Sequence, residues 1–91
     1  MSVIDVVGFV AAFCTTFSFL PQAIKVLKTR DTAALSLSMY AIFTVGVSLW
    51  LAYGIAKDDL AMILANGITL LLAFLILLVK LRNVRAAKET V

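Results

Sequence analysis

Three long apolar runs, separated by two short polar segments, set the pattern of this chain. The runs cover residues 3–27, about 38–56, and 60–79. A helix that spans a lipid bilayer needs roughly 20 residues, within a range of about 17–25. The pattern therefore predicts three transmembrane helices over these ranges.

The two connectors between the runs differ in length and charge. The first, residues 28–36, is polar and basic, and Ser36 or Ser38 is expected to cap the helix that follows it. The second, residues 57–59, is so short that the second and third helices must be antiparallel neighbours. Its two aspartates lie at the start of the third helix, where negative charge is favourable because the helix dipole is positive there.

The composition agrees with a membrane protein, since 64% of the residues are hydrophobic and only 14% are charged. Soluble domains average about 45–50% and about 25%. The chain has no histidine and one cysteine, Cys14, which excludes an intrachain disulfide and the familiar metal sites, so no metal or other cofactor is expected. No nucleophile–base pair can be assembled from these spans, so no enzyme is predicted.

The basic residues predict how the chain is oriented. All but one of the eight Lys and Arg residues lie near the first connector or in the C-terminal tail, and Lys57 is the exception. The positive-inside rule then places the first connector and the C-terminus in the cytoplasm, and the N-terminus outside. These charges flank apolar runs, which indicates contact with lipid headgroups rather than nucleic acid. Any dimer would be parallel, because all copies insert in one orientation.

We expect one transmembrane domain over residues 1–82 and a basic cytoplasmic tail over 83–91. The chain from Lys80 onward is expected to fray. Three helices cannot enclose a pathway for a small polar solute, and the chain has no internal repeat. If the protein is a transporter, a second copy must supply the other half.

Pro21, the only proline, lies inside the first apolar run. A proline in a helix lacks an N–H, and its ring crowds the carbonyl four residues earlier, here that of Phe17. In lipid, a freed carbonyl costs several kcal/mol unless another group satisfies it. Gln22 follows, with a donor and an acceptor in its side chain. Two interpretations remain: Pro21 ends the helix near the cytoplasm, or Pro21 and Gln22 form a hinge.

No Asp, Glu, Lys or Arg lies in the middle of any run, whereas proton-coupled transporters usually need such a group. The polar residues of interest are Trp50 and Asn66, which lie about 4–5 Å and about 6 Å outward from the centres of their spans. Their depths are therefore nearly equal. An indole stacks on the C–H faces of a sugar, and a carboxamide matches its hydroxyls. An amino-acid substrate would instead need a counter-charge or an open helix terminus.

These residues favour an uncoupled carrier of a neutral sugar, with the substrate site on the two-fold axis of a homodimer. Two simpler interpretations stay open: Asn66 as a polar link between helices, and Trp50 as a residue of the interfacial belt. Tyr53 and Lys57 share one helix face, and Lys57 can pair with an acidic residue of the facing copy to close the outer mouth. The alternative is a solvated turn with weak surface pairs.

Together these features resemble the bacterial SemiSWEET sugar transporters of the wider SWEET and PQ-loop family. The resemblance covers about residues 3–82. The segments that carry it are Pro21-Gln22, Thr29-Arg30-Asp31-Thr32, Ala34-Leu35-Ser36, Met39-Tyr40, Gly46 through Trp50 to Tyr53-Gly54, and Ala65-Asn66.

The resemblance implies an all-α bundle in which the third helix packs between the first and second. It also implies a parallel homodimer that moves mono- or disaccharides by alternating access, in the inner membrane of a bacterium. Lys57 stands where the family often has arginine, and lysine lacks the planar fork of that side chain. The implied roles are a sugar site at Trp50 and Asn66, a hinge at Pro21, an outer gate of Tyr53, Lys57 and Asp59, and an inner gate of Phe19, Met39 and Phe43.

Two other functions remain open at this point. One is transport of amino acids or other small metabolites, as in other PQ-loop proteins. The other is a non-transporting scaffold subunit of a membrane complex. The sequence does not decide between glucose and sucrose.

Overall fold

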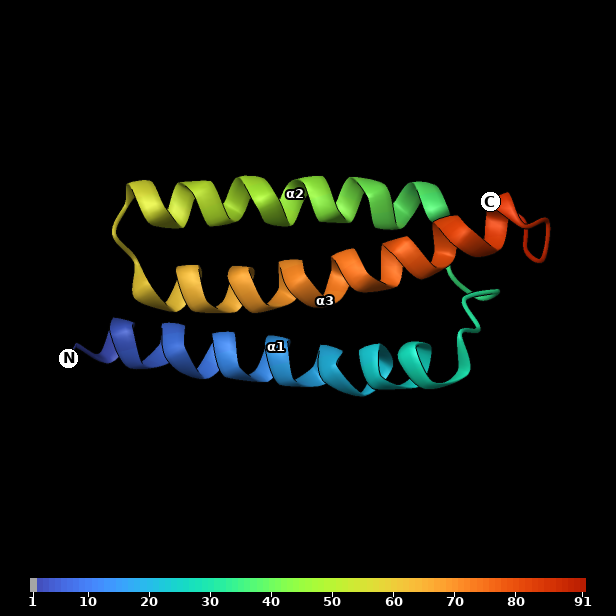
Figure 1. Ribbon diagram of the computed structural model, residues 1–91. Coiled ribbons are helices and arrows are strands. Elements are labelled where there is room, and N and C mark those ends of the chain that lie inside the picture. Colours follow the sequence, from blue (N-terminus) through green and yellow to red (C-terminus); the bar gives the residue numbers. More distant parts are fainter. Residues whose placement is uncertain (1) are drawn as a thin grey trace.

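The computed structural model describes residues 2–91, which form a bundle of three helices (Figure 1). Helix α1 spans Val3–Thr29, α2 spans Leu37–Ala56 and α3 spans Leu60–Arg85. Each helix is long and apolar enough to cross a membrane. Helix α3 lies between α1 and α2 and contacts both (Figure 1). The predicted three-helix fold and its 1-3-2 order are confirmed.

A polar side chain caps the start of each helix. Ser2 and Asp5 form a capping box at the start of α1. Ser36 Oγ accepts a hydrogen bond from the Met39 N–H (3.2 Å), so Ser36 caps α2. Asp59 Oδ1 accepts from the Met62 N–H (3.2 Å) at the start of α3. These bonds satisfy amides that would otherwise lack partners within the helix.

Pro21 lies within α1, and the helix continues beyond it to Thr29. The interpretation that Pro21 ends the helix is therefore wrong. Both buried residues of α1, Ala23 and Val26, follow the proline. Residues 3–20 are all at least partly exposed within the protomer. Helix α1 is thus buried most deeply after Pro21.

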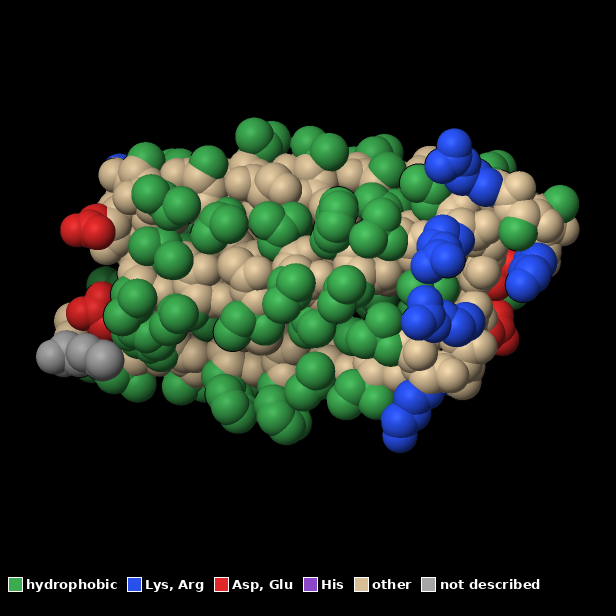
Figure 2. Space-filling view, viewed as in Figure 1, with side chains coloured by type: hydrophobic (Ala, Val, Ile, Leu, Met, Phe, Trp, Pro, Cys, Tyr) green, Lys and Arg blue, Asp and Glu red, His purple; other side chains and the backbone are tan. Residues whose placement is uncertain are grey.

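The hydrophobic core lies toward one end of the bundle, where Ala23, Val26, Tyr40, Ile76 and Val79 pack together. We call this the basic end, because the connector between α1 and α2 and the C-terminal tail place their Lys and Arg side chains there (Figure 2). The opposite end, which we call the turn end, holds the N-terminus and residues 57–59. Protomer packing therefore holds the basic end more firmly than the turn end.

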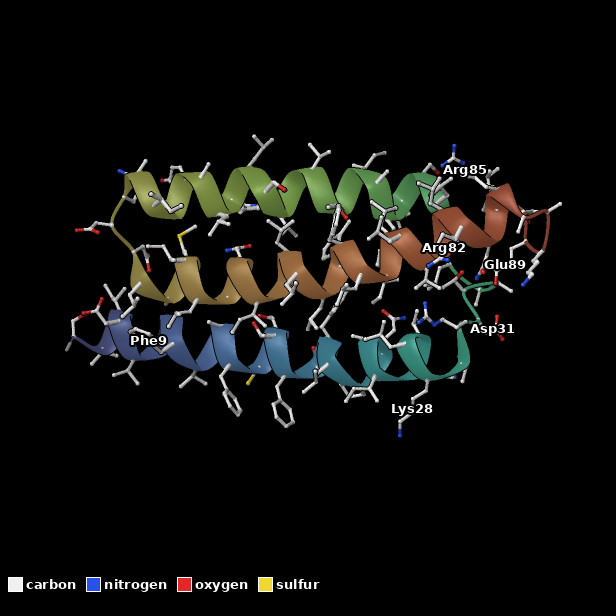
Figure 3. All side chains as sticks on the ribbon, in the orientation of Figure 1. Phe9, Lys28, Asp31, Arg82, Arg85 and Glu89 are labelled. Atoms are coloured by element: carbon white, nitrogen blue, oxygen red, sulfur yellow. The ribbon has the colours of Figure 1, made fainter. Side chains whose placement is uncertain are left out.

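The tail differs from the expectation that the chain frays after Lys80. Helix α3 continues to Arg85, and the chain then folds back so that Glu89 reaches the connector (Figure 3). The Glu89 carboxylate accepts hydrogen bonds from the Thr32 N–H (2.9 Å) and hydroxyl, and it forms an ion pair with Lys80 Nζ (3.1 Å). Lys80 is 0% exposed. We call Thr32, Lys80, Asn83 and Glu89 the tail clasp.

Candidate functional site

The predicted site residues of α2 lie along one face of that helix. Successive steps of four and three residues place them in one row, because an α-helix turns once every 3.6 residues. We call this row the α2 face; its residues are Met39, Phe43, Gly46, Trp50, Tyr53 and Lys57.

The outer half of the α2 face is a chain of contacts. The rings of Trp50 and Tyr53 meet edge to face, with centroids 5.7 Å apart. Lys57 Nζ lies 5.9 Å from the centroid of the Tyr53 ring, within the range of a cation–π contact. Trp50 remains 56% exposed and Tyr53 49% exposed within the protomer. The face is thus ordered locally and open to a second copy or a ligand.

Asn66 is half-buried on α3 and donates a hydrogen bond through Nδ2 to the Met62 carbonyl (2.9 Å). It lines a groove of about 760 Å³ between α1 and α3, together with Gly8, Ala11 and Thr15 of α1. Trp50 is not among the residues that line this groove. The protomer therefore presents Trp50 and Asn66 from different helices, and their joint use as a sugar site stays a prediction.

The predicted outer gate residues lie at the turn end but do not form an ion pair with one another within the protomer. Lys57 and Asp59 both line the mouth of the groove that contains Asn66. Asp59 caps α3, while Lys57 lies against Tyr53. Within residues 2–91, the ion pair that the structure shows is Lys80–Glu89 at the opposite end. A latch through Lys57 would therefore require a carboxylate of another copy.

At the basic end, side chains bridge α1 and α2 directly. The rings of Phe19 and Phe43 stack with centroids 5.8 Å apart, and Tyr40 meets the edge of Phe43 at 6.1 Å. The Tyr40 hydroxyl donates a hydrogen bond to Gln22 Oε1 (2.6 Å). Two of the three predicted inner gate residues therefore touch, while Met39 is 56% exposed. The side-chain oxygen of Gln22 therefore accepts a hydrogen bond from Tyr40 of α2 and is not free to interact with the backbone near Pro21.

Sequence reasoning missed two parts of this arrangement. Tyr40 enters the sequence analysis only through the resemblance, although it is almost fully buried and links α2 to Gln22. The tail clasp differs from the sequence-based expectation of a frayed tail. A signal for it exists in the sequence, because Glu89 is the only acidic residue in an otherwise basic tail.

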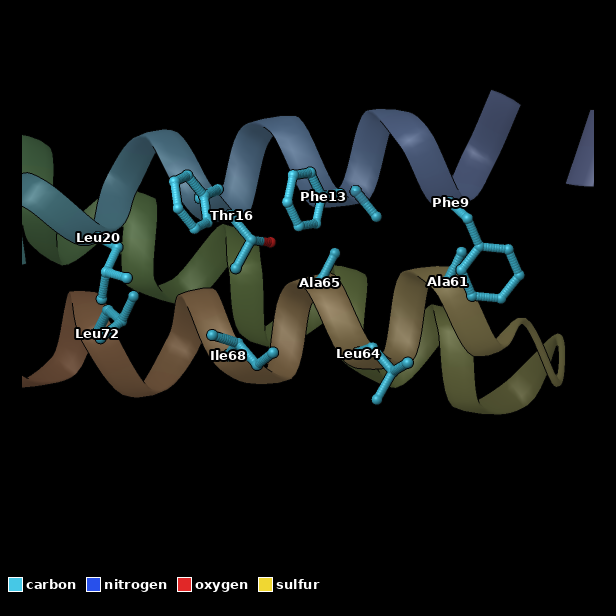
Figure 4. A pocket seen from close by; sticks show the side chains of 11 residues that line it. Phe9, Phe13, Thr16, Leu20, Ala61, Leu64, Ala65, Ile68 and Leu72 are labelled. Carbon is cyan, nitrogen blue, oxygen red and sulfur yellow. The ribbon is translucent and has the colours of Figure 1, made fainter. Parts of the chain in front are cut away.

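A second groove between α1 and α3, of about 490 Å³, is apolar (Figure 4). Phe9, Phe13 and Leu20 line it from α1, and Leu64 and Ile68 line it from α3. Its one polar side chain is Thr16, whose Oγ1 is buried without a hydrogen-bond partner. Because a sugar needs several donors and acceptors, this lining does not suit a sugar.

Comparison with known proteins gives consistent results. A family model described as PQ loop repeat matches residues 3–63. The chain is 47% identical over 85 residues to "Sugar transporter SemiSWEET" of Escherichia coli (strain UMEA 3162-1), covering 93% of this chain and 96% of the relative. It is 49% identical over 77 residues to the SemiSWEET of Leptospira biflexa serovar Patoc, covering 85% of this chain and 91% of the relative.

Two solved structures share the fold over most of both chains. The crystal structure of SemiSWEET in the inward-open conformation superposes with a TM-score of 0.89 at 45% identity, covering 97% of this chain and 95% of that one. The crystal structure of a bacterial homologue of SWEET transporters gives a TM-score of 0.79 at 37% identity, covering 89% and 98%.

Proposed function

The chain belongs to the PQ-loop repeat family, and from this membership and the α2 face we propose that it is an uncoupled sugar carrier. It carries mono- or disaccharides by alternating access and works as a parallel homodimer. The observation that carries the proposal is the exposed Trp50 at nearly the depth of Asn66, in spans that have no charged residue near their centres.

Trp50 and Asn66 have the chemistry that a neutral polyol needs. Tyr53 packs against the indole at 88°, which fixes the plane on which a sugar ring stacks. Asn66 uses one N–H for the Met62 carbonyl. Its second N–H and its carbonyl oxygen are available for sugar hydroxyls. A second copy related by a two-fold axis doubles both groups and closes the pathway.

The packing of α1 supports a hinge at Pro21 and Gln22. The helix lacks one backbone hydrogen bond there, because proline has no N–H to donate. The segment after Pro21 is held by core packing at Ala23 and Val26 and by the bond from Tyr40. None of residues 3–20 is fully buried within the protomer, and Phe19 is the one residue among them that packs against the core. Bending at Pro21 therefore moves the outer part of α1 against an anchored basic end.

The proposal includes two gates. The inner gate, at the basic end, consists of Phe19 and Phe43, whose rings stack, and of the exposed Met39. Tyr53, Lys57 and Asp59 form the gate at the turn end, where Lys57 reaches a carboxylate of the second copy. The positive-inside rule orients the basic end toward the cytoplasm and the N-terminus outward, in a bacterial inner membrane.

The experiment that tests the site compares four variants in proteoliposomes by glucose and sucrose counterflow. Trp50→Ala removes two stacking contacts per dimer, each worth about 1 kcal/mol, so apparent affinity should fall about 30-fold. Asn66→Ala should also reduce transport strongly. Leu49→Ala and Leu71→Ala are the controls, because both alter exposed apolar residues of the same helices. All four variants should elute as dimers.

Retained transport by both Trp50→Ala and Asn66→Ala would refute this site. Inhibition of sugar flux by amino acids would instead favour transport of amino acids or other small metabolites. No flux of any of these solutes, together with a stoichiometric partner in the purified protein, would favour a scaffold subunit.

A further inference from the structure

A small pocket at the basic end gathers three cationic side chains that the proposed transport does not use. It has a volume of about 370 Å³. Arg30 of the connector, Arg82 of α3 and Lys88 of the tail line it. Its other lining residues are Val79, Asn83 and Ala86. The cations come from three separate segments of chain, so the fold rather than local sequence brings them together.

Hydrogen bonds hold these three segments in place. Asn83 Nδ2 donates to the Arg30 carbonyl (2.8 Å), and the Lys88 N–H donates to the Asn83 carbonyl (2.9 Å). Arg30 is in the left-handed region (φ 57°), and its N–H caps α1 by donating to the Val26 carbonyl (2.7 Å). The tail clasp then ties Glu89, the neighbour of Lys88, to the connector. The pocket walls are therefore positioned before any ligand arrives.

The three cations are not neutralised within the protomer. In the part of the chain that the structure describes, the only ion pair is Lys80–Glu89. Glu89 is occupied by its bonds to Thr32, Lys80 and Asn83. Three positive charges around one small pocket attract an anion, and an arginine is well suited to bind phosphate through two N–H groups at once.

We propose that this pocket binds a phosphate group, and that its source is the headgroup of an anionic phospholipid in the leaflet at the basic end. The position favours lipid because Val79 lines the pocket beside the cations. Val79 belongs to the apolar core of the bundle, and Arg82 follows it by about 4.5 Å along α3. The pocket thus lies where the apolar span ends and a headgroup layer begins.

The test measures lipid retention by native mass spectrometry of the full-length protein, equilibrated with equal amounts of phosphatidylglycerol and phosphatidylcholine. We expect phosphatidylglycerol to be retained preferentially. Arg82→Gln and Lys88→Gln should each lower this preference about five-fold, the effect of losing one charge-assisted hydrogen bond to the phosphate. Lys28→Gln and Arg85→Gln are matched controls, because they remove a cation from the same end without altering the pocket lining (Figure 3).

Glu89→Gln separates a built pocket from diffuse attraction, since the two predict opposite results. The substitution raises the formal net charge of +3 by one, so diffuse electrostatics predicts tighter binding of anionic lipid. A pocket that depends on the tail clasp predicts several-fold weaker binding. Asp31→Asn changes the charge equally at an exposed connector position outside the clasp, and it should not weaken binding. Helix content and dimer elution confirm that each variant is folded.

Equal losses in the pocket and control variants would overturn the proposal, and so would equal retention of the two lipids. If Glu89→Gln does not fold, Lys88→Gln tests the pocket instead, because this variant leaves the four side chains of the tail clasp intact. A final arm adds inorganic phosphate at millimolar concentration. Displacement of phosphatidylglycerol by inorganic phosphate at that concentration would overturn the lipid as the source, whereas continued retention supports it.

Discussion

Replacing Gly54 with alanine should disturb the contact between α2 and α3 near the turn end. A Cβ at this position would lie 2.9 Å from Met62 Cβ and 3.4 Å from the Ile63 backbone nitrogen. Neither atom can rotate away, because the backbone fixes both. The helices must move apart by about 0.5 Å to bring the shorter distance to the 3.4 Å at which ordinary contact begins.

The magnitude follows from two opposing terms. Overpacking of this kind costs about 1–3 kcal/mol, while replacing glycine by alanine inside a helix gains about 0.5–1 kcal/mol. We expect Gly54→Ala to lose about 1 kcal/mol of unfolding free energy, near the middle of the difference between these two ranges. Gly67→Ala is the matched control, because its Cβ would meet no atom within 4 Å. That variant should gain about 0.5–1 kcal/mol.

The assay is helix unfolding in detergent, followed by circular dichroism, with sugar counterflow measured on the same samples. Gly54→Ala should also slow counterflow, because separating α2 from α3 displaces Trp50 relative to Asn66. If Gly54→Ala proves as stable as Gly67→Ala, the close approach of these two helices is refuted.

Three further predictions concern the basic end. Pro21→Ala should fold normally and slow counterflow, because restored backbone bonding favours one conformer; unchanged rates would exclude the hinge. Tyr40→Phe loses the bond to Gln22 and should cost about 1 kcal/mol of unfolding free energy; a double-mutant cycle with Gln22→Ala that shows no coupling would contradict this. For Glu89, burial alone would raise the pKa. The hydrogen bonds from Thr32, together with the hydrogen bond and positive charge of Lys80, outweigh the effect of burial and lower the pKa below its ordinary 4.5. The ionised Glu89 therefore stabilises the fold above about pH 4.5, and this stabilisation is lost as the pH falls through the lowered pKa. The melting temperature of the wild type should fall on acidification, and that of Glu89→Gln should change less.

The pattern of apolar runs predicted the three helices, whereas their 1-3-2 order of packing was implied by the resemblance to the SemiSWEET transporters. Apolar runs of spanning length leave few alternatives, and the connector over residues 57–59 is too short for anything except antiparallel neighbours. Two hydroxyls near the start of the second apolar run left Ser36 and Ser38 as candidate caps, and the structure shows that Ser36 is the cap. The depths of Trp50 and Asn66 follow from counting along each span at a fixed rise per residue.

Contacts between distant segments were not predictable in the same way. Apolar periodicity does not specify which faces of α1 and α2 meet, so the bond from Tyr40 to Gln22 was missed. The tail clasp joins Thr32 to Glu89 across 57 residues of sequence. Lys80 is expected to be solvated in a basic tail, and only the returning chain buries it beside a carboxylate. The sequence around Pro21 is compatible both with a helix end and with a helix that continues. Packing of the residues after the proline decides that the helix continues.

The most direct test of the account is counterflow of radiolabelled glucose and sucrose in proteoliposomes of the purified protein, with and without a proton gradient. An uncoupled carrier predicts saturable flux of at least one sugar, with a rate that the gradient does not change. Flux that follows the gradient would contradict uncoupled transport, and absence of flux for both sugars would contradict a sugar carrier.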